Sequence, residues 1–150
     1  MIRQAVSADL PEILRLSREL FLDPSSTSDK YANPDWPLSK EGEGAFREIL
    51  EKGFLWVCEE DEIVGFICAD VAAPQDWRPV KRVELISFYL SPKYRHMGIG
   101  TNMVEELFKW AKGIGAKTVF VSAYADNISG IEFYRSVGFI DESLSLEKEL

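Results

Sequence analysis

The segment from Val83 to Gly100, VELISFYLSPKYRHMGIG, constrains the fold of this chain more than any other. Its first eight residues are mostly β-branched, aromatic or aliphatic and end at Ser91-Pro92, a pattern that predicts a buried strand. From Thr101 onward the pattern becomes helical, with apolar residues at Val104, Leu107, Phe108 and Ala111. A glycine-containing turn therefore joins a buried strand to an amphipathic helix.

The turn between this strand and this helix has the chemistry of an anion site. The first N–H groups of a helix lack intrahelical acceptors and lie at the positive end of its dipole. Gly98 and Gly100 let a ligand come close to the backbone because they carry no Cβ. Arg95 adds positive charge, with Lys93 nearby and His96, the only histidine of the chain, beside it. We therefore predict a phosphate-binding turn.

Two common phosphate motifs do not explain this turn. The chain has no Gly-Lys-Ser/Thr, so it lacks a P-loop, and no third glycine follows Gly100 as a dinucleotide-binding fingerprint requires. The pattern Arg95-x-x-Gly98-x-Gly100 instead resembles the pyrophosphate-binding motif of the GNAT superfamily, the acyl-CoA-dependent N-acyltransferases. A second segment, ADNISGIEFYRSVGF over 125–139, resembles the family's late motif, in which an Asn opens a helix and a Tyr and Gly-Phe follow. The two motifs stand in the family's order.

The other segments fit the order of elements that GNAT domains use. We expect strands over 1–6, 54–60, 63–71, 83–90, 117–123 and 139–148. We expect helices over 9–22, 45–52, 101–112 and 127–137. The order βααβββαβαβ predicts one α/β domain over 1–150, with a mixed, mostly antiparallel sheet of about six to seven strands covered by about four helices.

Two local features of the first half are also predicted. Asp9, with Glu12 three residues later, forms a capping box for the first helix. Cys58 and Cys68 lie in the two arms of the hairpin, about five ladder positions out of register, or roughly 15 Å. A disulfide needs Cα atoms within about 7 Å, so we expect two buried thiols.

The polar segment over 24–43 permits two interpretations. A loop of this length is commonly a binding loop or a disordered surface excursion. Tyr31 and Trp36 are unusual in a purely solvated loop, which favours a lid over an acceptor site. Both interpretations stay open at this point.

Charge and composition exclude several classes of function. The net charge of −8 argues against a nucleic-acid-binding protein, which needs a basic face. No run approaches the about 20 apolar residues of a membrane span, and the amino terminus lacks the apolar region of a secretory signal. We expect a cytoplasmic protein, a monomer or homodimer, without nucleic-acid or membrane partners. No spacing of Cys, His, Asp or Glu suggests a metal site.

The resemblance to GNAT enzymes implies catalytic roles for two residues. Glu84 is the only acid in the central strand and stands where many of these enzymes have a general base. Otherwise it is a Glu at the mouth of the site that pairs with Arg82. Tyr134 resembles the general acid, because a phenol with a pKa of about 10 is protonated at neutral pH and can donate to a departing thiolate. Otherwise it packs the last helix on the sheet.

The resemblance also implies acetyl-CoA as the co-substrate. The backbone of Phe88, Tyr89 and Leu90 would pair with the pantetheine arm. Asn127, an N-cap by its position, would also contact the cofactor. The pyrophosphate site would comprise Arg95, His96, Met97, Gly98, Ile99, Gly100 and Thr101.

Two functions from different classes follow from these residues. The first is an N-acetyltransferase that acts on a primary amine of a small molecule or peptide through a ternary complex. The second is an acyl-CoA-binding module that senses or scaffolds without turnover. Glu84 and Tyr134 favour the enzyme, since a binding module needs only the segment from Arg95 to Gly100.

Overall fold

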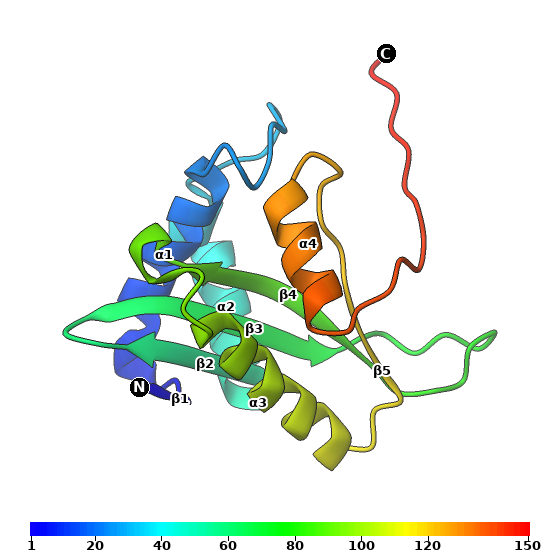
Figure 1. Cartoon of the computed structure of the whole chain (residues 1–150), viewed down its shortest axis with the longest axis horizontal. Coiled ribbons are helices and arrows are strands. Elements are labelled where there is room, and N and C mark those ends of the chain that lie inside the picture. The colour runs from blue at the N-terminus through cyan, green and yellow to red at the C-terminus, as the bar shows by residue number, and fades with distance from the viewer.

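The computed structural model describes all residues from 1 to 150 and contains a mixed five-stranded sheet (Figure 1). The strands follow one another across the sheet in chain order. The first three pairings are antiparallel, and the last, between β4 and β5, is parallel. The strands are β1 Ile2–Gln4, β2 Phe54–Glu59, β3 Ile63–Val71, β4 Arg82–Leu90 and β5 Thr118–Val121.

Four α-helices cover the two faces of the sheet. They are α1 Leu10–Leu22, α2 Lys40–Lys52, α3 Ile99–Gly113 and α4 Ile128–Ser136. Helices α1 and α2 lie on one face and α3 on the other (Figure 1). Short 3₁₀ turns occur at Ser7–Asp9, Trp36–Leu38 and Pro92–Tyr94. None of the helices is long and apolar enough to cross a membrane.

Strand alternation divides the buried side chains into two cores. The α1 core contains Val57 and Phe66 from the sheet, packed against residues of α1 and α2 such as Ile13. The α3 core contains the neighbouring strand residues, such as Ile67, packed against residues of α3 such as Leu107. Because β2 and β3 bury both faces, their sequences are almost continuously apolar instead of alternating with polar residues. Each fully buried aliphatic side chain contributes about 1.5–3 kcal/mol of transfer free energy.

The predicted fold class and the order of elements through α4 are confirmed, but some boundaries differ. Helix α2 begins at Lys40 instead of residue 45, because the Ser39 hydroxyl accepts the N–H of Gly42 and caps the helix there. The long loop therefore ends at Ser39. Helix α3 begins at Ile99, two residues before the expected start. Strands β1 and β5 are shorter than expected at both ends.

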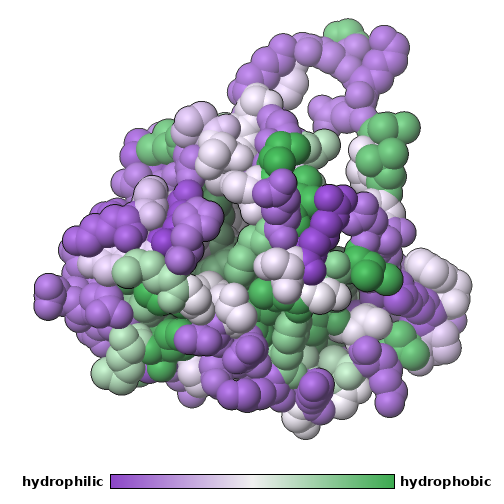
Figure 2. Space-filling model, viewed as in Figure 1, coloured by the Kyte–Doolittle hydropathy of each residue, from purple (hydrophilic) through white to green (hydrophobic).

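The expected strand over 139–148 is wrong, so the sheet has five strands instead of six or seven. Residues 139–150 form a tail without regular structure, and Figure 2 shows hydrophobic residues of the chain standing out along it. Acidic side chains of the tail form ion pairs with residues of several different elements, whereas a strand would pair with the edge of one neighbouring strand. The ion pairs are Asp141 with Arg135, Glu142 with Arg78 and Arg82, and Glu149 with Lys30.

The capping box at Asp9 is also wrong. Asp9 sits in the right-handed helical region at the end of a 3₁₀ turn, so its carboxylate does not cap α1. An N-cap residue normally adopts an extended conformation to reach the first N–H groups of the helix. The Asp9 carboxylate instead accepts hydrogen bonds from the Arg3 guanidinium and from the N–H of Val6. Glu12 pairs with Arg15.

Both cysteines are buried free thiols, as predicted. Their predicted offset was too large. Cys58 lies opposite Gly65, which is three residues from Cys68, and a bulge between Cys58 and Glu59 shifts the β2–β3 register at this point. Burial raises the pKa of the Cys68 thiol to about 12, so it is protonated at neutral pH.

Candidate active site

The sheet opens between β4 and β5. Their last parallel pair is Leu85 with Val121, and β4 then continues to Leu90 without β5, still paired with β3 on its other side (Figure 1). A bulge accompanies the opening, since Ile86 has no partner between the pairs of Leu85 with Ala69 and of Ser87 with Cys68. As a result, Ile86 is 47% exposed in the middle of an inner strand. We refer to this opening as the split.

The outer half of β4 presents backbone groups to the split. The N–H of Ser91 donates to the carbonyl of Val64 on the β3 side. Backbone groups alternate in direction along a strand, so those of Tyr89 also face β3, whereas those of Phe88 and Leu90 face the split. The Leu90 carbonyl agrees with this direction, since it accepts the Nε–H of Arg95 at 2.6 Å. The other groups on this side, the N–H and carbonyl of Phe88 and the N–H of Leu90, can pair with an extended ligand. The side chain of Tyr89 is buried in the α1 core.

The loop from β4 to α3 presents a row of N–H groups. Gly98 is the N-cap of α3 with φ of 84°, and His96 is the only non-glycine residue with positive φ, at 61°. The first helical bond runs from the N–H of Asn102 to the carbonyl of Gly98. The N–H groups of residues 96–101, ahead of that bond, have no acceptor within the chain. These six consecutive donors at the positive end of a 15-residue helix make an anion-binding arrangement. His96 and Met97 have exposed side chains.

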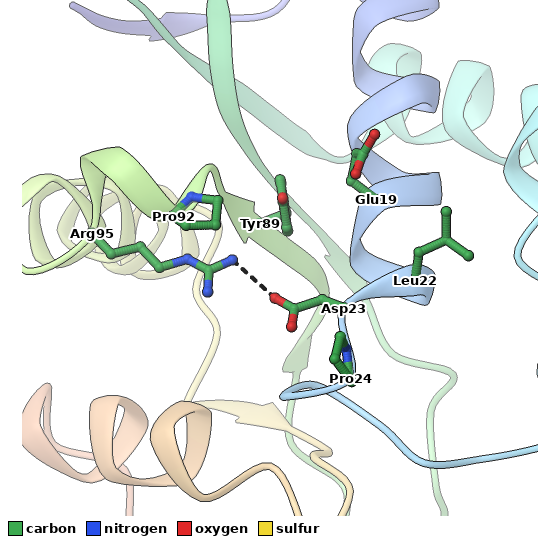
Figure 3. A pocket seen from close by; sticks show the side chains of 7 residues that line it. All are labelled: Glu19, Leu22, Asp23, Pro24, Tyr89, Pro92 and Arg95. Atoms are coloured by element: carbon green, nitrogen blue, oxygen red, sulfur yellow. Dashed lines mark hydrogen bonds and ion pairs between the residues drawn. The ribbon is translucent and has the colours of Figure 1, made fainter.

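Arg95 is held by neighbouring residues of the chain (Figure 3). Besides its bond to Leu90, its Nη2–H donates to Oδ2 of Asp23 at 3.1 Å, and its guanidinium lies 5.4 Å from the centre of the Tyr89 ring. Burial acts to raise the pKa of Asp23, but hydrogen bonds from Ser25 and Arg95 outweigh it and lower the pKa overall. A pocket of about 260 Å³ surrounds this pair. It is lined by Glu19, Leu22, Asp23, Pro24, Tyr89, Pro92 and Arg95.

Tyr134 lies on α4 within the α3 core. Its ring packs against those of Phe133 and Phe139, at centroid distances of 5.5 and 5.6 Å. Its hydroxyl makes no hydrogen bond within the chain, and the residue is half-buried. Burial raises the pKa of Tyr134 to about 12, which keeps the hydroxyl protonated at neutral pH. The group is thus a proton donor with no partner in the protein.

Asn127 caps the helix that carries Tyr134. Its Oδ1 accepts the N–H of Gly130 at 3.1 Å, which fixes the first turn of α4. Gly130 must be small, because a Cβ there would lie 2.5 Å from Nδ2 of Asn127. The side-chain amide of Asn127 donates no hydrogen bond within the chain, so it can donate to a ligand.

Glu84 lies on the other face of β4 from the α3 core. Its neighbours Val83 and Leu85 belong to that core, so alternation directs Glu84 to the opposite face. The half-buried Glu84 forms no ion pair and no side-chain hydrogen bond. The alternative pairing with Arg82 is not formed, since Arg82 pairs with Glu142 and stacks on the Phe120 ring at 4.2 Å. Glu84 and Tyr134 therefore belong to opposite faces of the sheet.

Two residues near the site did not emerge from the sequence. Asp23 binds Arg95, and the hydroxyl of Tyr124 donates to Asp29 at 2.7 Å. The sequence Asp23-Pro-Ser contains the signal of an Asx turn, and the structure has that turn. The partners of Asp23 and Tyr124 depend on tertiary structure, and no local pattern indicates them.

Comparison with known proteins identifies the family of this chain. Residues 10–139 match the family model described as the acetyltransferase (GNAT) family. The chain is 27% identical over 147 residues to an uncharacterized N-acetyltransferase of Methanocaldococcus jannaschii, covering 95% of this chain and 62% of the relative. It is 30% identical over 95 residues to the probable N-acetyltransferase san of Drosophila melanogaster, covering 61% of this chain and 50% of the relative. The chain thus spans between half and two thirds of the length of these relatives.

Solved structures show the same fold. The aminoglycoside N-acetyltransferase AAC(6')-Iy in complex with CoA superposes with a TM-score of 0.76 at 15% identity, covering 99% of this chain and 93% of that one. A putative acetyl transferase from Pyrococcus furiosus gives 0.75 at 22% identity, covering 100% and 99%. The identities are low, so these two structures support the fold alone. The family model matches residues 10–139, which is most of the chain, and this match shows that the chain belongs to the acetyltransferase (GNAT) family.

Proposed function

We propose that this protein is an N-acetyltransferase that transfers an acetyl group from acetyl-CoA to a primary amine of a small molecule or peptide. The observation that carries the proposal is the split between β4 and β5, which has free strand groups on one side and the N–H groups of residues 96–101 at its end. We further propose that residues 1–150 act as one acetyltransferase domain. A cytoplasmic location and the lack of nucleic-acid or membrane partners stay predictions from the sequence.

The proposed position of acetyl-CoA follows from these backbone donors. Its pyrophosphate binds the N–H groups from Met97 to Thr101, where the unpaired donors and the helix dipole favour an anion. Its pantetheine arm extends along β4 and pairs with Phe88 and Leu90 as an added strand. An N–H group of β4 near the thioester stabilises the oxyanion of the tetrahedral intermediate. Asn127, at the start of α4, supplies a further polar contact.

The chemistry proposed for this arrangement is direct attack. The amine nitrogen forms a bond to the thioester carbonyl carbon while Glu84, directly or through water, accepts the amine proton. The tetrahedral intermediate then collapses, the carbon–sulfur bond breaks, and the Tyr134 hydroxyl protonates the thiolate. Glu84 and Tyr134 belong to opposite faces of the sheet, so the acceptor and the leaving thiol have separate sides of the split.

The acceptor is proposed only as a class. Solved structures of the same fold include aminoglycoside acetyltransferases, one of them in complex with sisomicin and another in complex with CoA. They show the fold alone, and the amine acceptor is supported by the family match and by the N-acetyltransferase relatives, which do not indicate which amine.

A thiol-release assay tests the proposal against the alternative of a non-catalytic acyl-CoA-binding module. Purified protein is incubated with acetyl-CoA and a panel of small amines, amino acids, polyamines, aminoglycosides and peptides, and the free CoA thiol is measured. We expect at least one amine to raise thiol release well above hydrolysis, with the acetylated amine visible by mass spectrometry. Tight acetyl-CoA binding without stimulation by any amine class would favour the binding module.

A further inference from the structure

Asp23 connects the end of α1 to the loop that presents the N–H groups. One carboxylate oxygen, Oδ1, accepts the N–H and the hydroxyl of Ser25, at 2.9 and 2.6 Å. The other, Oδ2, accepts from Arg95 (Figure 3). The Asp23 side chain is 16% exposed and that of Arg95 31%, so this ion pair is partly shielded from water. Each carboxylate oxygen of Asp23 is thus used.

The segment from Asp23 to Asp29, which we call the strap, is also bonded to the other side of the split. The Ser28 hydroxyl donates to Asp126, and Asp29 accepts from Tyr124. Both partners stand in the connection that leads from β5 to α4 (Figure 1). The strap therefore joins the loop after β4 to the loop after β5, at the open end of the sheet.

The loop after β4 has few backbone hydrogen bonds of its own, so contacts with other segments must hold it in place. Within it, the N–H groups of Tyr94 and Arg95 bond to the carbonyls of Ser91 and Pro92, but those of the next three residues have no acceptor. His96 and Gly98 both have positive φ, a conformation that the loop does not stabilise by its own backbone bonds. The side-chain contacts of Arg95 are consequently the anchor closest to the free N–H groups.

We propose that Asp23 is a positioning residue for acyl-CoA binding, which rests on the proposed function. By holding Arg95 against the Leu90 carbonyl, Asp23 fixes the loop so that its N–H groups converge on the pyrophosphate. The charge of Arg95 is then neutralised by Asp23 and does not bind the pyrophosphate directly. The other possible arrangement predicts the opposite change in CoA affinity when the Asp23 carboxylate is removed. If Arg95 left Asp23 to bind the pyrophosphate, the Asp23 carboxylate would compete with the ligand, and its removal would strengthen binding.

Calorimetric titration of CoA into purified variants separates these two arrangements. Asp23→Asn keeps the volume and the oxygen that binds Ser25, but removes the charge that holds Arg95. We expect CoA affinity to fall about three- to fivefold, as suits a partly exposed ion pair. Asp23→Glu should recover part of the loss. Glu19→Gln is the matched control, since Glu19 lines the same pocket without bonding to Arg95, and it should leave the affinity within about twofold of wild type.

The double variant completes the test. If Asp23 acts through Arg95, adding Asp23→Asn to Arg95→Gln should cost no further affinity. Thermal unfolding of each variant shows that the fold is retained. Unchanged or tighter binding by Asp23→Asn, with wild type binding CoA, would overturn the role of Asp23 alone. Absence of CoA binding by wild type would overturn the proposed function, and this inference with it.

Discussion

Gly100 of α3 lies directly against Phe133 of α4: a Cβ on Gly100 would stand 3.3 Å from two carbons of the Phe133 ring. The Phe88 ring of β4 is equally close to that Cβ position and lies 5.6 Å from the Phe133 ring. The helix start that presents the N–H groups is therefore packed against the helix that carries Tyr134. One cluster of contacts therefore positions both the proposed anion site and the proposed proton donor.

Gly98 should be required for CoA binding and not only for stability. Its φ of 84° strains any branched side chain, while a Cβ there meets no atom within 4 Å. Gly98→Val should therefore cost roughly 1–2 kcal/mol of folding free energy through strain alone. It should also place methyl groups beside the free N–H groups and weaken CoA binding at least tenfold, about 1.4 kcal/mol.

Gly115→Val provides the matched control for Gly98. Gly115 follows the other end of α3, with φ of 80° and no atom within 4 Å of its Cβ position. It should lose similar stability in chemical unfolding but keep CoA affinity by calorimetry. If both variants bound CoA with the same affinity, the pyrophosphate would not bind at this turn.

Glu84→Gln should lower turnover while leaving the fold intact. Glu84 makes no contact whose loss would destabilise the protein, so urea unfolding should change little. Loss of a positioned base should reduce kcat by about 10²-fold or more. Asp70→Asn is the control, because Asp70 is the cross-strand partner of Glu84 and also half-buried. Comparable activity of the two variants, measured with any accepted amine, would show that Glu84 is not the base.

The Asp9 carboxylate should contribute stability that acid removes. Hydrogen bonds from Arg3 lower the pKa of Asp9, burial opposes them, and the N–H of Val6 adds to the lowering. The folded pKa lies below the unfolded value of about 3.9, so this stability is present above that value and is lost as pH falls through the folded pKa. Asp9→Asn should lower the unfolding free energy by about 1.5–3 kcal/mol at pH 7.

Urea unfolding at pH 7 and below pH 4 measures this effect. The difference between wild type and Asp9→Asn should shrink as the pH falls. Asp61→Asn in the exposed β2–β3 turn should show no such difference, because Asp61 has no partner. A gap that stays constant in acid would mean that Asn disturbs the packing and that the charge of Asp9 contributes nothing.

The segment from β4 to α4 was predictable because its signals are local. The apolar run of β4, the glycines at the start of α3 and the Asn127 cap each describe a neighbourhood of a few residues. Ser39 caps α2, but Gly42 and Gly44 weaken the helical pattern after it, so the sequence alone favours a later start of this helix. The family resemblance supplied the candidate residues, and the structure shows their backbone surroundings.

The features missed from the sequence depend on contacts between distant residues. The tail over 139–150 alternates enough to suggest a strand, yet its acidic residues find partners on several other elements. The Asp9 carboxylate binds the Arg3 guanidinium, which β1 places beside it, and does not cap α1. Asp23 and Arg95 are 72 positions apart, and neither identity predicts the other. The fold brings such partners together from distant parts of the sequence, and local sequence patterns do not identify them.

Tyr134→Phe tests whether the Tyr134 hydroxyl protonates the departing thiolate. The substitution keeps ring and packing, and the hydroxyl has no partner in the chain, so stability and acetyl-CoA affinity should barely change. Turnover with an accepted amine should fall about 10²–10⁴-fold, because the proton donor acts in the transition state. Tyr94→Phe, another half-buried tyrosine packed against the α3 core, should keep full activity. We expect Tyr134→Phe to lose turnover while it keeps its stability and its affinity for acetyl-CoA. Turnover within a few-fold of wild type would mean that Tyr134 only packs α4 and donates no proton.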